Sequence, residues 1–282
     1  MKYGVALGRL NPAFFVDATL AAERLGYESV WLPEHLVFTA AMSRSPHPGE
    51  LHPPVPPETP IFDAFAYLSY LAGRTERVRL GTHVYNIGLR HPFVAARAVQ
   101  TLDIVSGGRV EFGVGASWLE EEWVAAELDF ASRGRRVDEA IEICRRLWTE
   151  PVVSYHGAHF TFDDVVFEPK PVQRPGPPVL IGGESAAALR RAARLGDGWI
   201  GMGHTIESAT AQIARLEREL AANGRSLDGG FQVCLGGPVA SVADAARWES
   251  IGVTRLLVSP WRRSPEALDG LAAFAARLAL SP

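Results

Sequence analysis

Short runs of apolar and β-branched residues recur along the chain, and each is followed by a loop and then by a segment with helical spacing. Near-continuous apolar runs of this kind are typical of parallel strands that are covered on both faces. We therefore predict eight parallel β-strands. The predicted strands span residues 3–7, 29–32, 78–86, 110–114, 179–181, 199–202, 231–235 and 255–258.

The segments between these runs place their apolar residues on one helical stripe. In the segment 135–148, Val137, Ile141, Cys144 and Trp148 fall on one face, as expected for an amphipathic helix that packs on a sheet. Eight alternations of strand and helix with right-handed crossovers most simply close into a (β/α)₈ TIM barrel, which would fill residues 1–282 as a single domain. An open, doubly wound sheet is the alternative.

Two segments are longer than ordinary loops. A proline-rich insertion at about residues 40–60 follows the second predicted strand, and another insertion covers about residues 151–178. Insertions that follow a barrel strand lie at the catalytic mouth, so we expect the first to cover a substrate. The second alternates around His156 and Gly157 like a short hairpin on the opposite side of the barrel.

Composition and charge narrow the class of protein. The chain is 47% apolar and 21% charged, with a formal net charge of −4, which favours a globular core and argues against a nucleic-acid or anionic-membrane partner. A signal-peptide core and a membrane-spanning run are both missing from the sequence, so we expect a cytoplasmic protein. Cys144 and Cys234 lack the spacing of a disulfide framework or metal site, and we predict no metal.

The fourth predicted strand contains Gly113 and Gly115 and leads into an acidic helix start. A dinucleotide fingerprint would need a third glycine where Trp118 stands, so a Rossmann loop is disfavoured. The glycines indicate instead that the backbone approaches a flat ligand or a neighbouring strand, with Trp118 as a candidate cavity wall. Glu120 to Glu122 suit the positive end of the helix dipole, and one of them can face the cavity.

Polar side chains also stand near the ends of the second and third predicted strands. Glu34 and His35 follow the second strand, and a histidine there can handle a proton or hydrogen-bond a heterocycle, although a surface pair is equally consistent. Thr82, His83 and Asn86 are unusually polar for a barrel strand. They either satisfy each other in the core or face a ring with many donors and acceptors.

The fifth predicted strand ends in a Gly182-Gly183 turn that enters a helix through Glu184 and Ser185. Free backbone N–H groups at a helix start form a ready site for a phosphate, although Glu184 is an awkward neighbour for an anion. A simple N-cap by Ser185 is the alternative.

Four segments, taken together, resemble the bacterial-luciferase-like monooxygenase superfamily, and within it the branch of coenzyme F420-dependent oxidoreductases. They are GYESVWLPEHL, RVRLGTHVYNIGLRHPFVAARAVQTLDIVSGGRVEFGVGASWLEEEW, SRGRRVDEAIEICRRLW and PPVLIGGESAAALRRAARLGDGW. The resemblance covers the first to the sixth predicted strand. It implies a TIM barrel whose mouth holds a flavin or deazaflavin, with hydride transfer between that ring and an organic substrate.

The resemblance also implies roles for single residues. His35 matches the catalytic histidine beside the ring, and His83-Val84 matches a non-prolyl cis peptide that forms a wall behind it. Asn86 matches a position that hydrogen-bonds the ring, and Gly115 would lie beneath it. Gly182, Gly183, Glu184 and Ser185 match the turn that receives the cofactor phosphate.

The sequence departs from the sugar-phosphate dehydrogenases of this family. Trp118 stands where they place a catalytic Glu, and Thr39 stands close to where they place a Trp. This difference implies a less phosphorylated and more apolar substrate, in a pocket lined by Thr39 and Trp118. Glu121 is then the nearest replacement proton carrier.

The overall pattern resembles the deazaflavin branch more than the FMN branch, so we expect F420 as the cofactor, with FMN as the alternative. An FMN-dependent monooxygenase and a non-catalytic flavin-binding protein are the rival functions. A cofactor-free barrel lyase or hydrolase would need a convergent Lys, Asp or metal set, which the predicted strand ends lack. Relatives commonly pair, so we expect a homodimer.

Overall fold

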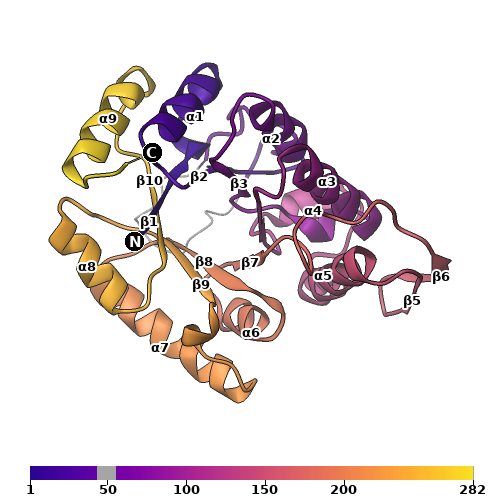
Figure 1. Cartoon of the computed structure of the whole chain (residues 1–282). Coiled ribbons are helices and arrows are strands. Elements are labelled where there is room, and N and C mark those ends of the chain that lie inside the picture. The colour runs from indigo at the N-terminus through magenta and orange to yellow at the C-terminus, as the bar shows by residue number, and fades with distance from the viewer. Residues whose placement is uncertain (43–54, 282) are drawn as a thin grey trace.

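Eight parallel strands close into a barrel in the computed structural model, which describes residues 1–42 and 55–281 (Figure 1). Their order around the barrel is β1-β10-β9-β8-β7-β4-β3-β2. The predicted (β/α)₈ barrel is therefore confirmed, and the open sheet is wrong. The barrel strands are β1 (Lys2–Ala6), β2 (Ser29–Leu32), β3 (Arg79–Thr82), β4 (Val110–Val114), β7 (Val179–Gly182), β8 (Gly198–Gly203), β9 (Gln232–Gly236) and β10 (Arg255–Val258).

The third strand is shorter than its apolar run predicts. β3 ends at Thr82, and the chain leaves the ladder before Tyr85 pairs again with Val114 of β4. The polar residues that follow Thr82 therefore belong to the mouth of the barrel and not to its wall.

Helices surround the barrel and bury their apolar stripes against it (Figure 1). The stripe predicted from Val137 to Trp148 is buried along α5. The helices of the described residues are α1 (Phe15–Arg24), α2 (Ala64–Ala72), α3 (Pro92–Val105), α4 (Glu120–Ala125), α5 (Arg133–Thr149), α6 (Ala186–Leu195), α7 (Ile206–Ala222), α8 (Val242–Ser250) and α9 (Ala267–Arg277). Among them we find no helix with the length and apolar character needed to span a membrane.

An antiparallel hairpin lies on the connection between α5 and β7, as predicted. Its strands are β5 (Val153–His156) and β6 (Thr161–Val165), and it projects from the barrel beside α5 (Figure 1). Most of the proline-rich insertion, residues 43–54, lies outside the described residues. The single-domain organisation with insertions at about 40–60 and 151–178 stays a prediction.

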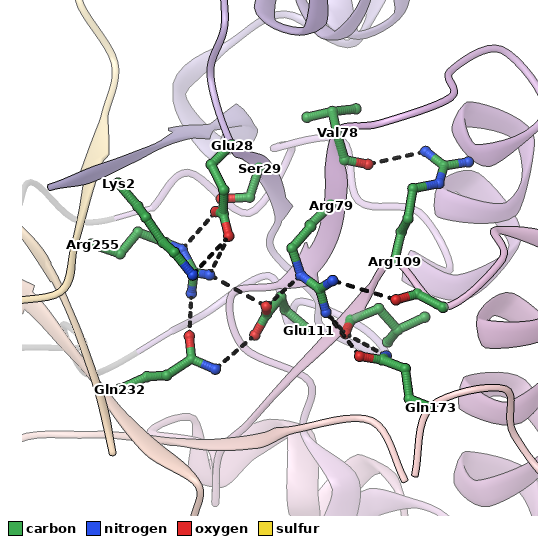
Figure 2. A network of polar contacts seen from close by, with 12 residues as sticks. Lys2, Glu28, Ser29, Val78, Arg79, Arg109, Glu111, Gln173, Gln232 and Arg255 are labelled. Atoms are coloured by element: carbon green, nitrogen blue, oxygen red, sulfur yellow. Dashed lines mark hydrogen bonds and ion pairs between the residues drawn. The ribbon is translucent and has the colours of Figure 1, made fainter. Parts of the chain in front are cut away.

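The amino ends of the strands carry a network of charged and polar side chains (Figure 2). Arg255 is fully buried, and its guanidinium donates to Glu28 at 2.7 and 2.8 Å and to Glu111 at 3.3 Å. Arg79 donates to the same oxygen of Glu111, Oε1, at 2.6 Å. Gln232 bridges Arg255 and Glu111. Charge at this end is therefore paired inside the barrel.

An apolar layer lies above this network, inside the barrel. It consists of Trp31, Leu180, Ile200, Cys234 and Leu257, and Val84 packs against it from the mouth. Side chains thus fill the barrel at its amino end and centre, so a site that can receive a ligand is expected at the carboxyl ends of the strands.

Candidate active site

The peptide bond between His83 and Val84 is cis, as the family resemblance implied. The backbone on either side is tied to both neighbouring strands. The N–H of His83 donates to the carbonyl of Leu32 at 2.8 Å, and the N–H of Tyr85 donates to Gly113 at 2.8 Å. The segment His83-Val84 is therefore fixed between β2 and β4 at the mouth of the barrel.

Gly115 and Gly182 make room for the side chain of Val84. A Cβ atom on Gly115 would lie 2.6 Å from Cγ2 of Val84, and one on Gly182 would lie 2.8 Å from Cγ1. Both distances are shorter than van der Waals contact. The sequence predicted that a ligand or a neighbouring strand approaches the backbone at Gly115, whereas in the structure the side chain of Val84, from the segment after β3, makes this approach.

A cavity of about 450 Å³ opens beside His83. Its walls come from the carboxyl ends of β1, β8, β9 and β10, from the segments that follow these strands and from α9, and several of the lining residues are glycines. The glycines that line it are Gly8, Gly201, Gly203, Gly236 and Gly237. Its volume lies within the range of small-molecule sites, and its wall can approach a flat ligand closely.

The His83 side chain lines this cavity, and its surroundings keep it uncharged. Removal from water lowers the pKa of His83 to about 4, because a charged imidazolium is disfavoured where solvent is excluded. Near neutral pH the ring therefore offers one N–H donor and one nitrogen acceptor to a bound molecule.

His35 lies in the coil after β2 and is held by a carboxylate of α4. Its Nδ1 lies 3.0 Å from Oε2 of Glu122, and its ring contacts the rings of Phe38 and Trp118, with centroids 4.7 and 5.6 Å away. The structure thus brings two predicted site residues together, His35 and Trp118. The partner carboxylate of His35 is Glu122, whereas the sequence singled out Glu121; a catalytic role for Glu121 stays a prediction.

Asn86 and Glu34 form a second buried cluster under the mouth. The N–H of Asn86 donates to the Glu34 carboxylate at 2.9 Å, and its side-chain amide donates to the Glu34 carbonyl at 3.3 Å. Arg90 pairs with the same carboxylate at 2.5 Å and lies over the ring of Tyr85. Glu34 is therefore a buried anchor and not half of a surface pair. Contact between Asn86 and a cofactor ring stays a prediction.

The turn after β7 leads directly into α6. Gly183 has a φ of +120°, and its N–H donates to the carbonyl of Ile200 at 3.2 Å. The hydroxyl of Ser185 accepts the N–H of Ala188, which makes Ser185 the N-cap of α6. The other N–H groups in the first turn of α6 have no carbonyl acceptor within their own helix, as at every helix start. Phosphate binding by this turn stays a prediction.

Glu184 points toward β8 and α7. Its carboxylate accepts hydrogen bonds from the N–H of Met202 at 2.6 Å and the amide of Gln212 at 2.9 Å, and it lies 3.2 Å from Nε2 of His204. Burial by itself would raise the pKa of Glu184, but His204 and the hydrogen bonds to Met202 and Gln212 lower it below its usual value. The negative charge is thus matched locally, which reduces its conflict with an anion at the turn.

His204 was not identified from the sequence, although a search for polar residues directly after each predicted strand could have found it. His204 directly follows Gly203, the last residue of β8. The predicted substrate residue Thr39 is half-buried in the coil after β2, where its hydroxyl donates to the carbonyl of Ala41 at 3.4 Å; its role stays a prediction. Within the described part of the chain, three or more His, Cys, Asp or Glu side chains nowhere gather as a metal site would require.

Three curated relatives illustrate the range of similar proteins. The uncharacterized protein Rv0940c of Mycobacterium tuberculosis is 30% identical over 94% of this chain and 92% of its own length. The F420-dependent glucose-6-phosphate dehydrogenase of Segniliparus rotundus is 32% identical over 71% of this chain and 56% of its own. The FMNH(2)-dependent dimethylsulfone monooxygenase of Pseudomonas putida is 31% identical over 64% of this chain and 48% of its own.

Solved structures share the fold at lower sequence identity. An F420-dependent secondary alcohol dehydrogenase, solved with an F420-acetone adduct, superposes with a TM-score of 0.79 at 16% identity and covers 100% of this chain and 99% of its own. The family model described as luciferase-like monooxygenase matches residues 3–273. The chain therefore belongs to the luciferase-like monooxygenase family.

Proposed function

We propose that this protein is an oxidoreductase that transfers a hydride between coenzyme F420 and a small organic substrate. The observation that carries the proposal is the glycine-lined cavity beside His83. The family assignment supports it. The similarity to an F420-dependent dehydrogenase over 71% of the chain supports this cofactor.

The residues at the mouth fit a tricyclic deazaflavin. Neutral His83 can exchange hydrogen bonds with a ring that carries both donors and acceptors, and Val84 provides an apolar surface. The turn from Gly182 to Ser185 would hold the phosphate at the positive end of α6. When bound, the deazaflavin supplies or accepts a hydride.

The part of the mouth formed by the segments after β2 and β4 suits the substrate. His35 can accept or release a proton during hydride transfer, while Phe38 and Trp118 present apolar rings around it. Such surroundings exclude water and favour a weakly polar substrate over a phosphorylated one. Glu121 remains the candidate for a second proton carrier.

An FMN-dependent monooxygenase is the second candidate. Its support is the match to an FMNH(2)-dependent monooxygenase, which covers 64% of this chain. The proposed site would accept either ring, so the choice between the cofactors requires a binding measurement.

The first experiment is a titration of the purified protein with F420 and, separately, with FMN, followed by quenching of ring fluorescence. We expect tight binding of F420 and weak binding of FMN. Tight binding of FMN alone would replace the proposal with the monooxygenase. If neither ring binds, the functional assignment is wrong.

The variant His35→Asn separates binding from catalysis. We expect its affinity for F420 to stay within about twofold of wild type, because His35 is not among the residues that line the cavity. Turnover of an accepted substrate should fall by roughly 10²- to 10⁴-fold, the usual contribution of a proton-transferring side chain. Unchanged turnover would remove His35 from the chemistry.

We also propose that the protein is a cytoplasmic homodimer that pairs through the outer faces of α2 and α3. Large apolar side chains are exposed there, with 50% of Tyr70, 56% of Val94 and 55% of Val105 accessible. Apolar area of this kind commonly marks a protein interface. Light scattering should give a dimer mass for the wild type and a monomer mass for the double variant Val94→Asp/Val105→Asp; a monomeric wild type contradicts the pairing.

A further inference from the structure

Glu122 on α4 is fully buried, yet its carboxylate meets three polar groups from two separate segments. Oε1 accepts the N–H of Leu36 at 2.6 Å, and Oε2 lies 3.1 Å from the Ser117 hydroxyl and 3.0 Å from Nδ1 of His35. A buried carboxylate is costly unless such partners satisfy it. These three contacts therefore compensate the burial of the Glu122 carboxylate.

The geometry fixes which of these groups carry hydrogen. The Leu36 N–H can only donate. The Ser117 hydroxyl oxygen already accepts the N–H of Leu119 at 3.2 Å, which leaves its hydrogen for Glu122. A carboxylate that accepts both of these bonds is best satisfied in its ionised form, which has acceptors only. Nδ1 of His35 must then carry a hydrogen.

This assignment determines the chemistry of the other ring nitrogen. A neutral imidazole with hydrogen on Nδ1 has a lone pair on Nε2, so Nε2 is the atom that can take up a proton. The rings of Phe38 and Trp118 lie against the imidazole. The ring is thus oriented through Nδ1 and enclosed by aromatic contacts.

We propose that Glu122 is a positioning residue that holds His35 in its Nδ1–H form and directs Nε2 toward the substrate. The inference rests on the proposed function, in which His35 exchanges a proton with substrate. It assigns to Glu122 the task of orientation and leaves proton transfer to His35. Glu121, one residue away on the same helix turn, is not needed for this role.

The tautomer can be measured without cofactor or substrate. We would label the histidines with ¹⁵N and assign His35 among the eight histidines of the chain by comparison with His35→Asn. At a pH high enough to keep the ring neutral, the ¹⁵N shifts should show a protonated Nδ1 and an unprotonated Nε2. The opposite tautomer in the wild type overturns the proposal.

The variant Glu122→Gln tests the cause. Its amide keeps the size of the side chain but can present an N–H to Nδ1, so we expect the ¹⁵N spectrum to shift toward the Nε2–H form. Glu122→Asp retains the charge and should preserve the wild-type tautomer in part. Glu217→Gln replaces an exposed carboxylate of α7 and should leave the spectrum unchanged.

Kinetics provide the second readout. With an accepted substrate, Glu122→Gln should lower kcat by about 10²-fold or more, since an orienting carboxylate acts through its histidine. The dissociation constant of the cofactor should stay within about twofold. If Glu122→Gln keeps both the Nδ1–H form and full turnover, Glu122 has no positioning role.

Cofactor binding and the tautomer of His35 are measured independently, so each can fail without the other. A protein that binds neither F420 nor FMN but shows the Nδ1–H form refutes the proposed function and supports the contact between Glu122 and His35. A protein that binds F420 and carries the Nε2–H form supports the proposed function and refutes the positioning role of Glu122. The wild-type spectrum decides the tautomer even if Glu122→Gln fails to fold.

Discussion

Val84 determines which residues can stand at positions 115 and 182. Its two methyl groups occupy the space that a Cβ atom would take at either position. Neither glycine has a positive φ, so the constraint is one of space and not of backbone conformation. Because valine is stiff at χ1, its methyl groups cannot move aside without a shift of the backbone.

Gly182→Ala should therefore displace Val84 and weaken cofactor binding. We expect a loss of about 1–3 kcal/mol of unfolding free energy, which is usual for one methyl group forced into a packed site. Combination with Val84→Ala should restore part of both losses. Gly73→Ala is the matched control, because a Cβ there meets its nearest neighbour at an ordinary 3.7 Å. Equal effects of the two glycine variants would contradict the model of steric overlap; chemical denaturation and F420 titration measure both quantities.

At the scale of residues, the sequence placed candidate residues at the mouth but did not reveal which side chains contact one another. His35 and Trp118 could be placed at the mouth because both follow strand ends. The choice between Glu121 and Glu122 could not be made, since neighbouring helix positions differ by about 100° and the start of α4 sets their direction. Arg90, the partner of Glu34, stands too far along the chain for any local pattern to reveal it.

At the scale of elements, Glu23 of α1 holds the loop between α2 and β3. Its carboxylate accepts the N–H groups of Glu76, Arg77 and Val78 at 2.9, 2.7 and 2.9 Å. Burial by itself would raise the pKa of Glu23, but these backbone hydrogen bonds lower it below its ordinary 4.5. The ionised form is therefore favoured in the folded state.

The sign of the pH effect follows from this lowered pKa. The stabilisation is fully present above pH 4.5 and is lost as the pH falls through the folded-state pKa of Glu23. Glu23→Gln should thus reduce unfolding free energy at pH 7 by roughly 1–2 kcal/mol, with a smaller difference at pH 3. Urea unfolding at both pH values measures this, with Glu217→Gln as a control; a difference that grows in acid would contradict the assignment.

The elements themselves were largely predictable, because each barrel strand is a distinct apolar run. The clearest departure is β3, predicted to span 78–86 and found at Arg79–Thr82. Residue types could show that Thr82, His83 and Asn86 were unusual for a strand. They could not show that the backbone leaves the ladder after Thr82, because that depends on hydrogen bonds to Leu32 and Gly113 from other strands.

At the scale of the whole molecule, the two ends of the barrel have separate tasks. The amino end holds the paired charges around Arg255 (Figure 2), and the carboxyl end holds the cavity and His35. The apolar layer around Trp31 separates them. A change at the amino end should therefore alter stability without altering the site.

Arg255→Met tests this division. It leaves Glu28 and Glu111 short of a partner, so we expect a loss of about 3–5 kcal/mol of unfolding free energy. Addition of Glu28→Gln should recover part of that loss. F420 affinity of the folded variant should be unchanged. Arg263→Met removes an exposed ion pair with Glu266 and should cost under about 1 kcal/mol; a comparable loss there would contradict the role of burial.

The contact of Val84 with Gly115 and Gly182 limits how this barrel can be recombined. A chain of repeated strand-helix units looks like a series of interchangeable modules. Here, however, the side chain comes from the segment after β3, while the two spaces that receive it come from the segments of β4 and β7. A chimera that takes one of these units from a relative with a different residue size should misfit at the mouth. The three units must therefore be inherited or exchanged together.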